Sequence, residues 1–299
     1  MRSSIRAQKN YTTYALMILP ALSVYALIMA FPVFFSVGLS FTDYNIYTGE
    51  ITPVGLSHYL EMFTDPIFWR ALRNNLFVVG VSVFGQIPLG FILAYILYRR
   101  LVRFTSFFES VVFLPMMIST VIVGLLWRHI ILSPRSVLNN IIRAVTGNPD
   151  FLLQFNVSPL MAMIPVGVVM LWIYTGFYML VFFANLQRIE NSLLESAMID
   201  GAKESQIFRK IIVPMMSGPI IVTSILAISG SLKGFDLIWA MTGGGPANFT
   251  TVLPIYMYRY AWEFGQYGYG SAASTIIVIL SIILIVAFRY INRKMSGEV

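Results

Sequence analysis

The sequence predicts an all-α, polytopic membrane protein with six transmembrane helices. Three observations lead to this fold class. Hydrophobic residues make up 58% of the 299 residues, charged residues make up only 11%, and the mean hydropathy is +0.77, which is too apolar for a domain surrounded by water. The apolar residues form long uncharged runs. The basic residues between these runs are unevenly distributed, which indicates an orientation.

Seven uncharged runs approach or exceed the roughly 20 residues that a membrane-spanning helix needs. They are 10–42, 76–98, 110–127, 151–187, 211–232, 237–258 and 264–288. The run at 237–258 is the weakest, because three glycines and Pro246 stand in its middle. Backbone that cannot hold a helix survives at membrane depth only where it is buried in protein or faces water. We therefore expect a loop or a re-entrant segment there, and six spans in total.

The basic residues orient these six spans, because Lys and Arg gather in cytoplasmic loops. Thirteen of the 20 fall on the face that carries both ends of the chain, and seven fall on the other face. The sequence thus predicts that both termini are cytoplasmic. The net charge of +7 then reflects membrane topology, and we expect no binding to nucleic acid. We also expect the first apolar run to stay as an anchor, because no small-residue cleavage site follows it.

Three parts follow along the chain. Residues 1–70 hold the first transmembrane helix and an extracytoplasmic segment, residues 71–290 hold a five-helix working unit, and residues 291–299 form a cytoplasmic tail.

Several kinds of chemistry are missing from the sequence. There is no cysteine, and neither histidine belongs to a metal-binding spacing, so no metal site is predicted. No lysine follows a phosphate-binding glycine loop, so the chain cannot hydrolyse ATP by that route. No pair of carboxylates sits in the middle of a span, where a proton relay would need it. We predict no catalytic residue and no cofactor bound by this chain.

The stretch at 195–214 is unusual, because it places six charges between two apolar runs. Ser192 and Glu195 have the spacing of a capping box, which predicts the start of a short helix. Leu193, Leu194, Ala197 and Met198 are expected to share one face of that helix. Asp200 and Gly201 predict its end, because glycine tolerates the left-handed conformation found there.

A second helical pattern begins at Ala202 and continues through Ile207, Phe208, Ile211 and Ile212 to Pro214. The stretch is thus expected to form two short helices hinged at Gly201, with an apolar ridge facing the cytoplasm. On periodicity alone, it could equally be an amphipathic helix lying on lipid headgroups.

These residues closely resemble the coupling loop of ABC importer permeases, in which E-A-A, two or three further residues and D-G-A are followed by F, I and L-P. The matching residues are Glu195, Ala197, Asp200, Gly201, Ala202, Phe208, Ile211 and Pro214. Ser196 replaces an alanine of the pattern, and Val213 replaces its leucine. The resemblance implies the transmembrane domain of a type I ABC importer. It also implies that the loop at 188–214 inserts into a groove on a separate ATPase subunit.

Two further stretches look like the sugar-transport branch of that family. One lies upstream, with Trp172, Gly176, Phe177 and Met179 followed by Ala184, Leu186, Gln187 and Ile189. There Asn185 and Glu190 replace the usual Gly and Pro. The other comprises Phe235, Asp236, Ile238 and Trp239 followed by Thr242, Gly243, Gly244, Gly245, Pro246 and Thr250, and it is similar to the maltose and glycerol-3-phosphate type.

The resemblance implies a permease subunit that imports a sugar, oligosaccharide or sugar derivative across a bacterial or archaeal cytoplasmic membrane by alternating access. Its partners would be a second similar permease, two ATPase subunits that use the ATP, an extracytoplasmic solute-binding protein and membrane lipid. One alternative keeps this machinery with another cargo, such as phosphate, peptide or polyamine. The other is an ion-driven secondary carrier, which would need buried ionisable groups.

Sugars bind to aromatic faces with a few placed polar groups. Residues of this kind lie on or near the fourth and fifth spans, where the resemblance places the substrate pathway. They are Trp172, Tyr174, Tyr178, Ser231 and Trp239. Each could instead anchor the chain at the membrane interface or pack between helices. Lys233 and Asp236 are expected to form an ion pair at the outer end of a helix.

Overall fold

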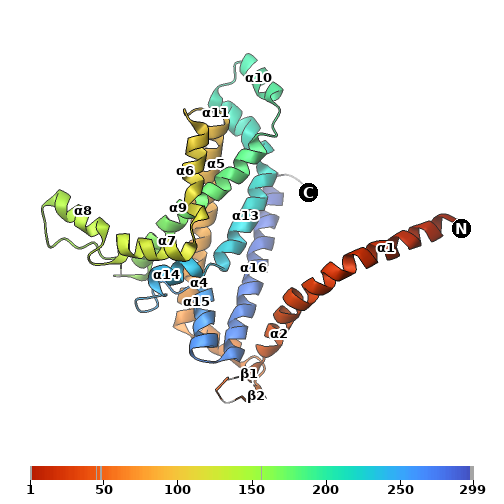
Figure 1. The fold of residues 1–299 in the computed structure, drawn as a ribbon, viewed down its shortest axis with the longest axis vertical. Coiled ribbons are helices and arrows are strands. Elements are labelled where there is room, and N and C mark those ends of the chain that lie inside the picture. The colour runs from red at the N-terminus through yellow and green to blue at the C-terminus, as the bar shows by residue number, and fades with distance from the viewer. Residues whose placement is uncertain (1, 45, 48, 156, 297–299) are drawn as a thin grey trace. The chain divides into compact units, whose positions relative to one another are not determined.

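The computed structural model describes residues 2–44, 46, 47, 49–155 and 157–296 (Figure 1). It is dominated by helices, which confirms the all-α fold class. The longer helices are α1 (Arg2–Tyr25), α2 (Phe31–Leu39), α4 (Pro66–Val81), α5 (Ile87–Tyr98), α6 (Thr105–Met117), α7 (Thr120–Trp127), α8 (Val137–Thr146), α9 (Pro159–Leu186), α10 (Asn191–Ile199), α13 (Ser217–Leu232) and α16 (Tyr267–Ser296). The shorter ones are α3 (Ser57–Thr64), α11 (Glu204–Ile207), α12 (Val213–Met215), α14 (Asp236–Thr242) and α15 (Leu253–Tyr258). Five π-helical turns lie at Ala26–Ala30, Ser82–Gln86, Arg128–Leu132, Phe208–Ile212 and Arg259–Glu263 in the described part of the chain.

The chain forms two compact units. The first comprises residues 1–64 and 257–276, and the second comprises residues 65–256 and 277–299. In the first unit, strands β1 (Thr42–Tyr44) and β2 (Ile51–Pro53) pair antiparallel, with Thr42 opposite Pro53. The buried His58 fixes this hairpin to α3, because its Nε2 donates to the carbonyl of Thr42 at 3.1 Å.

The second unit is a bundle built around α5 and α9, and it contains the functional segment. α4 continues through the π turn Ser82–Gln86 into α5, and α9 packs along α5. α6 also packs against α9, and the two backbones approach very closely at Gly176. A Cβ atom there would lie 2.3 Å from the carbonyl oxygen of Val112, so only glycine fits. Small residues allow such close packing in membranes, where lipid is as apolar as the side chains.

In the described residues, five helices are long and apolar enough to cross a membrane. They are Thr13–Leu39, Pro66–Tyr98, Thr120–Thr146, Pro159–Leu186 and Tyr267–Tyr290. A sixth span is counted if the bent pair Glu204–Met215 and Ser217–Leu232 is taken as one. The charged residues of that pair all precede Ile211, so its first arm extends beyond the uncharged run. The segment at 237–258 is not among the spans, and its centre is the non-helical loop predicted from the glycines.

The expected third span, at 110–127, is wrong in its detail. α6 ends at Met117, and Ile118 and Ser119 are extended, with ψ angles of 141° and 128°, before α7 begins. Pro115 lies in the last turn of α6 and lacks an N–H to donate, which weakens that turn. The uncharged run therefore holds two short helices in place of one continuous span.

Candidate functional site

The charged segment at 188–214, named the coupling segment below, contains a well-formed helix end. Gly201 has a φ of +80°, in the left-handed region that favours glycine. The amide of Gly201 donates to the carbonyl of Met198 at 3.0 Å, and the amide of Ala202 donates to that of Ala197 at 3.0 Å. These two bonds define a Schellman motif, which closes α10 and reverses the chain. The predicted hinge at Gly201 is therefore present.

The predicted capping box at the start of α10 is wrong. The helix begins at Asn191, so Ser192 already lies inside its first turn and cannot cap it. The hydroxyl of Ser192 instead donates to the carboxylate of Glu190 at 3.4 Å. A capping contact is found at the next helix, where the side chain of Gln206 accepts from the amide of Lys203 at 2.7 Å.

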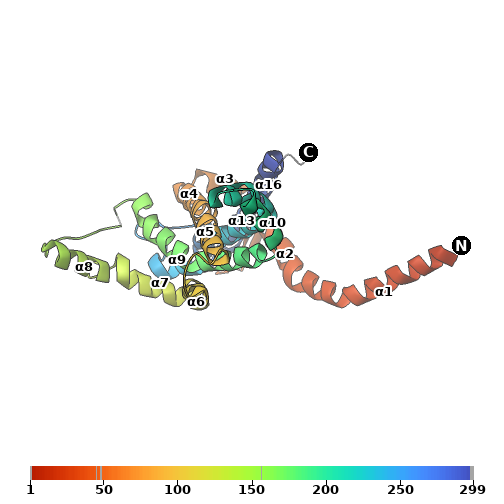
Figure 2. The ribbon, with the colours of Figure 1, turned by 90° about the horizontal axis from the view of Figure 1, so that it is seen from above.

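The predicted second helix is present, and it is more complex than a single helix. α11 continues through the π turn Phe208–Ile212 into α12, which includes Pro214. At Met216 the chain bends by 66° into α13. Ile207 and Ile212 are buried at 1% and 0% exposure, so this arm is firmly packed on the bundle. Figure 2, which views the molecule from the end that carries α10, shows α10 nearest the viewer over this bundle.

The faces of α10 differ from the expected single apolar ridge. Leu194 is buried and Ala197 is half-buried, and both contact the core, so they anchor the helix. Leu193, Met198 and Ile199 are exposed, with Ile199 at 86%. The four predicted residues do lie within one arc of the helix, because successive residues point about 100° apart. The middle of that arc, Leu194 and Ala197, is turned to the core, whereas Leu193 and Met198 at its two edges are exposed. Ile199, near the end of the helix, lies outside the arc and is exposed as well.

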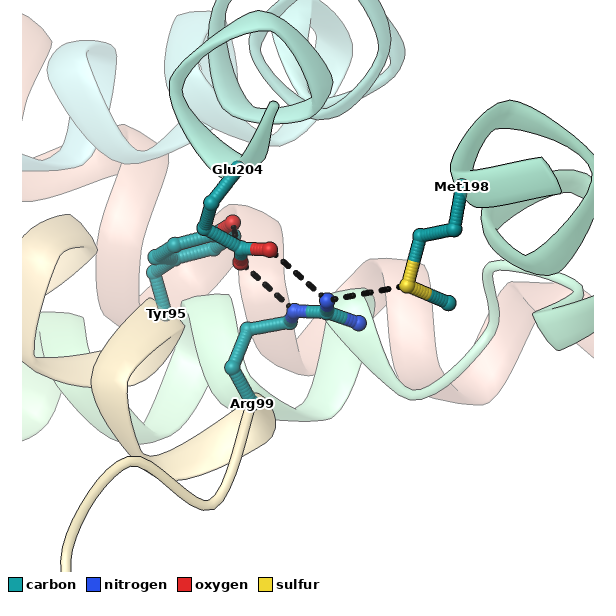
Figure 3. A network of polar contacts seen from close by, with 4 residues as sticks. All are labelled: Tyr95, Arg99, Met198 and Glu204. Atoms are coloured by element: carbon teal, nitrogen blue, oxygen red, sulfur yellow. Dashed lines mark hydrogen bonds and ion pairs between the residues drawn. The ribbon is translucent and has the colours of Figure 1, made fainter. Parts of the chain in front are cut away.

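Arg99, at the end of α5, holds the coupling segment (Figure 3). Its guanidinium donates two hydrogen bonds to the carboxylate of Glu204, from Nε at 2.7 Å and from Nη2 at 2.8 Å. The hydroxyl of Tyr95 donates to the same carboxylate, and Nη2 also approaches the sulfur of Met198 at 3.9 Å. Paired bonds between Arg and a carboxylate fix geometry as well as charge. Arg99 therefore contacts both helices of the coupling segment.

The Arg99 guanidinium, as donor to the carboxylate, lowers the pKa of Glu204 below its usual range. The pair therefore stabilises the folded segment at neutral pH and loses this contribution as pH falls through the lowered pKa. Aromatic packing adds to the contact. The ring of Phe208 lies 4.7 Å from that of Tyr95 and 5.6 Å from that of Phe91, measured between centroids.

A second polar cluster fixes the glycine-rich loop at 243–252. The amide of Asn74 donates to the carbonyls of Phe249 and Thr251, at 2.9 and 2.8 Å. The side-chain oxygen of Asn75 accepts from the amide of Leu253 at 2.6 Å. Both asparagines are buried.

Further contacts complete this cluster at the exposed side of the loop. Arg70 donates to the carbonyl of Ala247 at 2.7 Å, and its guanidinium lies over the ring of Phe249. Within the loop, Thr242 and Thr250 share a hydrogen bond of 2.7 Å between their hydroxyls. α4 thus holds the loop in one conformation.

A family model described as binding-protein-dependent transport system inner membrane component matches residues 86–297. The chain belongs to this family. The permease is 32% identical to a probable ABC transporter permease protein of Pyrococcus horikoshii over 280 residues, which cover 93% of this chain and 95% of that protein. It is 30% identical to the lactose transport system permease protein of Rhizobium radiobacter over 291 residues, or 95% of this chain and 94% of that one.

A solved structure with the same fold is that of a bacterial ABC transporter involved in the import of the acidic polysaccharide alginate. The permease matches one of its chains with a TM-score of 0.80 and 24% identity, over 98% of this chain and 99% of that chain. This likeness shows the fold. Membership of the family makes the permease a membrane-spanning transport subunit of the ABC type.

The residues expected along a substrate pathway lie in the second unit of the permease, most of them beside aromatic neighbours. Trp172 is 43% exposed and contacts Trp127, with ring centroids 5.4 Å apart. Trp239 stacks on Phe235, also at 5.4 Å. Tyr174 is half-buried and Tyr178 is buried in the core.

Ser231, the remaining residue of this group, is buried and donates to the hydroxyl of Ser82 at 2.8 Å. A cavity of about 560 Å³ in the second unit is lined by other residues, among them Arg128, His129 and Thr242.

The expected ion pair between Lys233 and Asp236 is absent from the described part of the permease. α13 ends at Leu232 and α14 begins at Asp236, so the two residues do not share a helix face. Sequence reasoning also missed the contacts of Arg99 and of the two asparagines. A usable signal was present for the polar residues of the second span. Asn75, Ser82 and Gln86 are separated by seven and four residues, which places them on one helix face.

Proposed function

We propose that this permease is one subunit of an ABC importer that moves a sugar, an oligosaccharide or a sugar derivative across a bacterial or archaeal cytoplasmic membrane. The cargo is supported by the names of its relatives. These include the lactose permease above and a trehalose/maltose transport system permease of Thermococcus litoralis, 30% identical over 281 residues. The motifs around Trp172 and Gly244 support the same cargo.

The coupling segment is the part that we assign to contact with an ATPase subunit. The observation that carries this assignment is that α10 is anchored to the bundle by Leu194 and Ala197 while it keeps three large apolar side chains exposed. Leu193, Met198 and Ile199 offer apolar surface beyond the bundle, while Leu194 is buried at 2% exposure and ties the helix to the core. Exposed apolar patches next to polar residues are typical of protein interfaces.

The motif residues have distinct parts in this proposal. Gly201 sets the turn, while Ala197 and Ala202 pack beneath it, because both contact the core. Glu195 and Asp200 are exposed and are available to a partner. Phe208 fastens the second arm to α5, and Pro214 lies in α12 just before the bend into α13.

The partners in this proposal are a second, homologous permease, two ATP-binding subunits and an extracytoplasmic solute-binding protein. ATP is bound and hydrolysed by the ATPase subunits, and closure of those subunits moves α10 and opens the pathway outward. Both termini are placed in the cytoplasm. The pathway is assigned to the fourth and fifth spans, with Trp172, Tyr174, Tyr178, Ser231 and Trp239 as its nearest aromatic and polar groups.

A cross-linking experiment tests the contact with the ATPase. The chain contains no cysteine, so Ile199→Cys gives a single reactive thiol in this subunit. We expect it to cross-link to the ATPase subunit in the assembled complex, and Val145→Cys on α8, which is also exposed, serves as the control. Cross-linking at Val145 and none at Ile199 would contradict the proposal. The cargo is tested separately, by binding-protein-dependent uptake of lactose, maltose and trehalose in vesicles.

A further inference from the structure

One helix of the second unit contacts both polar clusters described above. α4, the π turn Ser82–Gln86 and α5 are continuous from Pro66 to Tyr98, a span of 33 residues. At about 1.5 Å per residue, this helix is about 50 Å long, and we name it the rod. In Figure 1, α10 and α11 lie at one end of the rod, and α14 lies toward the other.

At the first end, the rod holds the coupling segment through Arg99. The two hydrogen bonds from Arg99 to Glu204 and the bond from Tyr95 join the rod to the start of α11. The side chain of Arg99 is 19% exposed and that of Glu204 is 44% exposed, so the pair lies at the surface of the bundle. Phe208 packs against two aromatic rings of α5. The arm at 204–215 therefore cannot shift without moving the rod or breaking these contacts.

At the second end, the rod holds the loop at 243–252 through Arg70, Asn74 and Asn75. Arg70 and Asn74 bind backbone atoms of the loop, and Asn75 binds the amide of Leu253, which directly follows it, so they fix the path of the loop whatever its side chains are. A displacement of this end of the rod would leave buried polar groups without hydrogen-bond partners, which is unfavourable. The loop is therefore expected to follow the rod.

Between the ends, the rod keeps polar contacts with its neighbours. Ser82 accepts from Ser231 on α13, and the amide of Gln86 donates to the carbonyl of Met170 on α9, at 3.1 Å. Asn75 also donates to the carbonyl of Ser231 on α13, at 3.2 Å. The rod is therefore hydrogen-bonded to α13 and α9 along its length, while its two ends alone bind the coupling segment and the loop.

We propose that the rod transmits movement of the coupling segment to the loop at 243–252, with Arg99 and Arg70 as the positioning residues at its two ends. This inference rests on the proposed function, because it takes α10 as the element that the ATPase moves. The rod would carry this movement in addition to the covalent connection of the coupling segment through α12 into α13. The loop then responds to the state of the ATPase although it lies far from it along the rod.

The test compares the modification rate of single thiols by a maleimide in two states of the purified complex. The states are nucleotide-free and trapped with ADP and vanadate, so no transported substrate is needed. One thiol is Ile199→Cys on α10, and the other is Ala247→Cys on the loop, both at exposed positions. We expect each thiol to react at different rates in the two states.

The decisive comparison adds Arg99→Ala to each thiol variant. We expect the difference between states to be lost at Ala247 and kept at Ile199, because the segment still moves but the rod no longer follows. Arg70→Ala, at the other end of the rod, should also abolish the difference between states at Ala247. The exchanged pair Arg99→Glu with Glu204→Arg should restore the difference, which a general loss of structure could not explain. Arg103→Ala, an exposed arginine of the same turn, is the matched control.

The outcomes separate the two proposals. Equal rates at Ile199 in both states of the wild-type complex would contradict the proposed function. A change at Ile199 with equal rates at Ala247 would contradict the rod alone. A change at Ala247 that survives Arg99→Ala in an assembled complex would also overturn it.

Discussion

The amide of Ala202 donates to the carbonyl of Ala197 at 3.0 Å, across the turn that Gly201 makes with a φ of +80°. This bond fixes the direction in which the chain leaves α10. The turn therefore determines the orientation of α10 and of its exposed side chains. A substitution at this turn is the most direct test of whether the coupling segment contacts the ATPase.

Replacing Gly201 by valine should uncouple the transporter without preventing membrane insertion. The left-handed conformation costs a non-glycine residue on the order of 1–2 kcal/mol, and no atom lies within 4 Å of an added Cβ, so the effect is conformational. The measurement is binding-protein-stimulated ATP hydrolysis and uptake by the reconstituted complex. Gly201→Asn is the control, because Asn tolerates this conformation and should retain more activity. Normal stimulation and uptake in the valine variant would favour a helix that lies on lipid.

Replacing Glu195 by alanine should leave α10 folded and impair stimulation of the ATPase. Because Ser192 does not cap the helix and Glu195 is exposed, the substitution removes no hydrogen bond described within the chain. We expect a change in thermal stability within about 0.5 kcal/mol, as for other surface substitutions. Thermal unfolding of the purified subunit and ATPase stimulation of the complex are measured in parallel. A large loss of stability would show that Glu195 supports the helix after all.

Replacing Gly176 by alanine should destabilise the second unit. The added Cβ would meet the backbone of α6 at Val112, which cannot rotate away, so α6 and α9 must separate. Overpacking of this kind costs about 1–3 kcal/mol, and it should appear as a lower midpoint of thermal unfolding in detergent. Gly230→Ala on α13 is the matched control, because nothing lies within 4 Å of its Cβ. Equal midpoints for the two variants would contradict the close packing of α6 and α9.

The charge distribution predicts that residue 297, which lies outside the described residues, is cytoplasmic, and that residues 243–270 are outside or folded back from outside. Single cysteines placed in each region should be modified by an impermeant reagent only in the outer region of intact cells. Modification of residue 297 from outside would exclude the six-span topology, and the coupling segment would then lie on the wrong side for an ATPase.

The chain alone, purified into lipid vesicles, should neither hydrolyse ATP nor take up sugar under an ion gradient. This follows from the missing phosphate-binding loop and from the lack of paired carboxylates within the spans. Uptake by the lone subunit, driven by a proton or sodium gradient, would instead establish the secondary-carrier alternative.

Features that depend on local sequence could be predicted well. Apart from the third, the uncharged runs identified the spans, because membrane depth restricts every residue of a helix. The turn at Gly201 was predicted correctly, since few residues other than glycine adopt the left-handed conformation. The glycines at 243–245 correctly excluded a span. Each of these inferences needed only a short stretch of chain.

Features that depend on tertiary contact could not be predicted in the same way. Arg99 and Glu204 are 105 residues apart, and nothing in either neighbourhood indicates the partner. The capping box failed because the helix begins at Asn191, two residues earlier than a Ser192 cap requires. The substrate residues were chosen by type, and in the structure most of them pack against neighbouring aromatic rings.

The π turn at Ser82–Gln86 gives the rod a defined angular phase. A π turn contains one residue more than the α-helix it interrupts, so its removal would rotate one end by about 100° relative to the other. Asn75 and Arg99 lie on opposite sides of this turn, and each binds a partner that is fixed in place. After a deletion of one residue between them, the helix could keep its hydrogen bonds to the loop or to the coupling segment, but not both. This helix therefore tolerates substitutions far more readily than insertions or deletions.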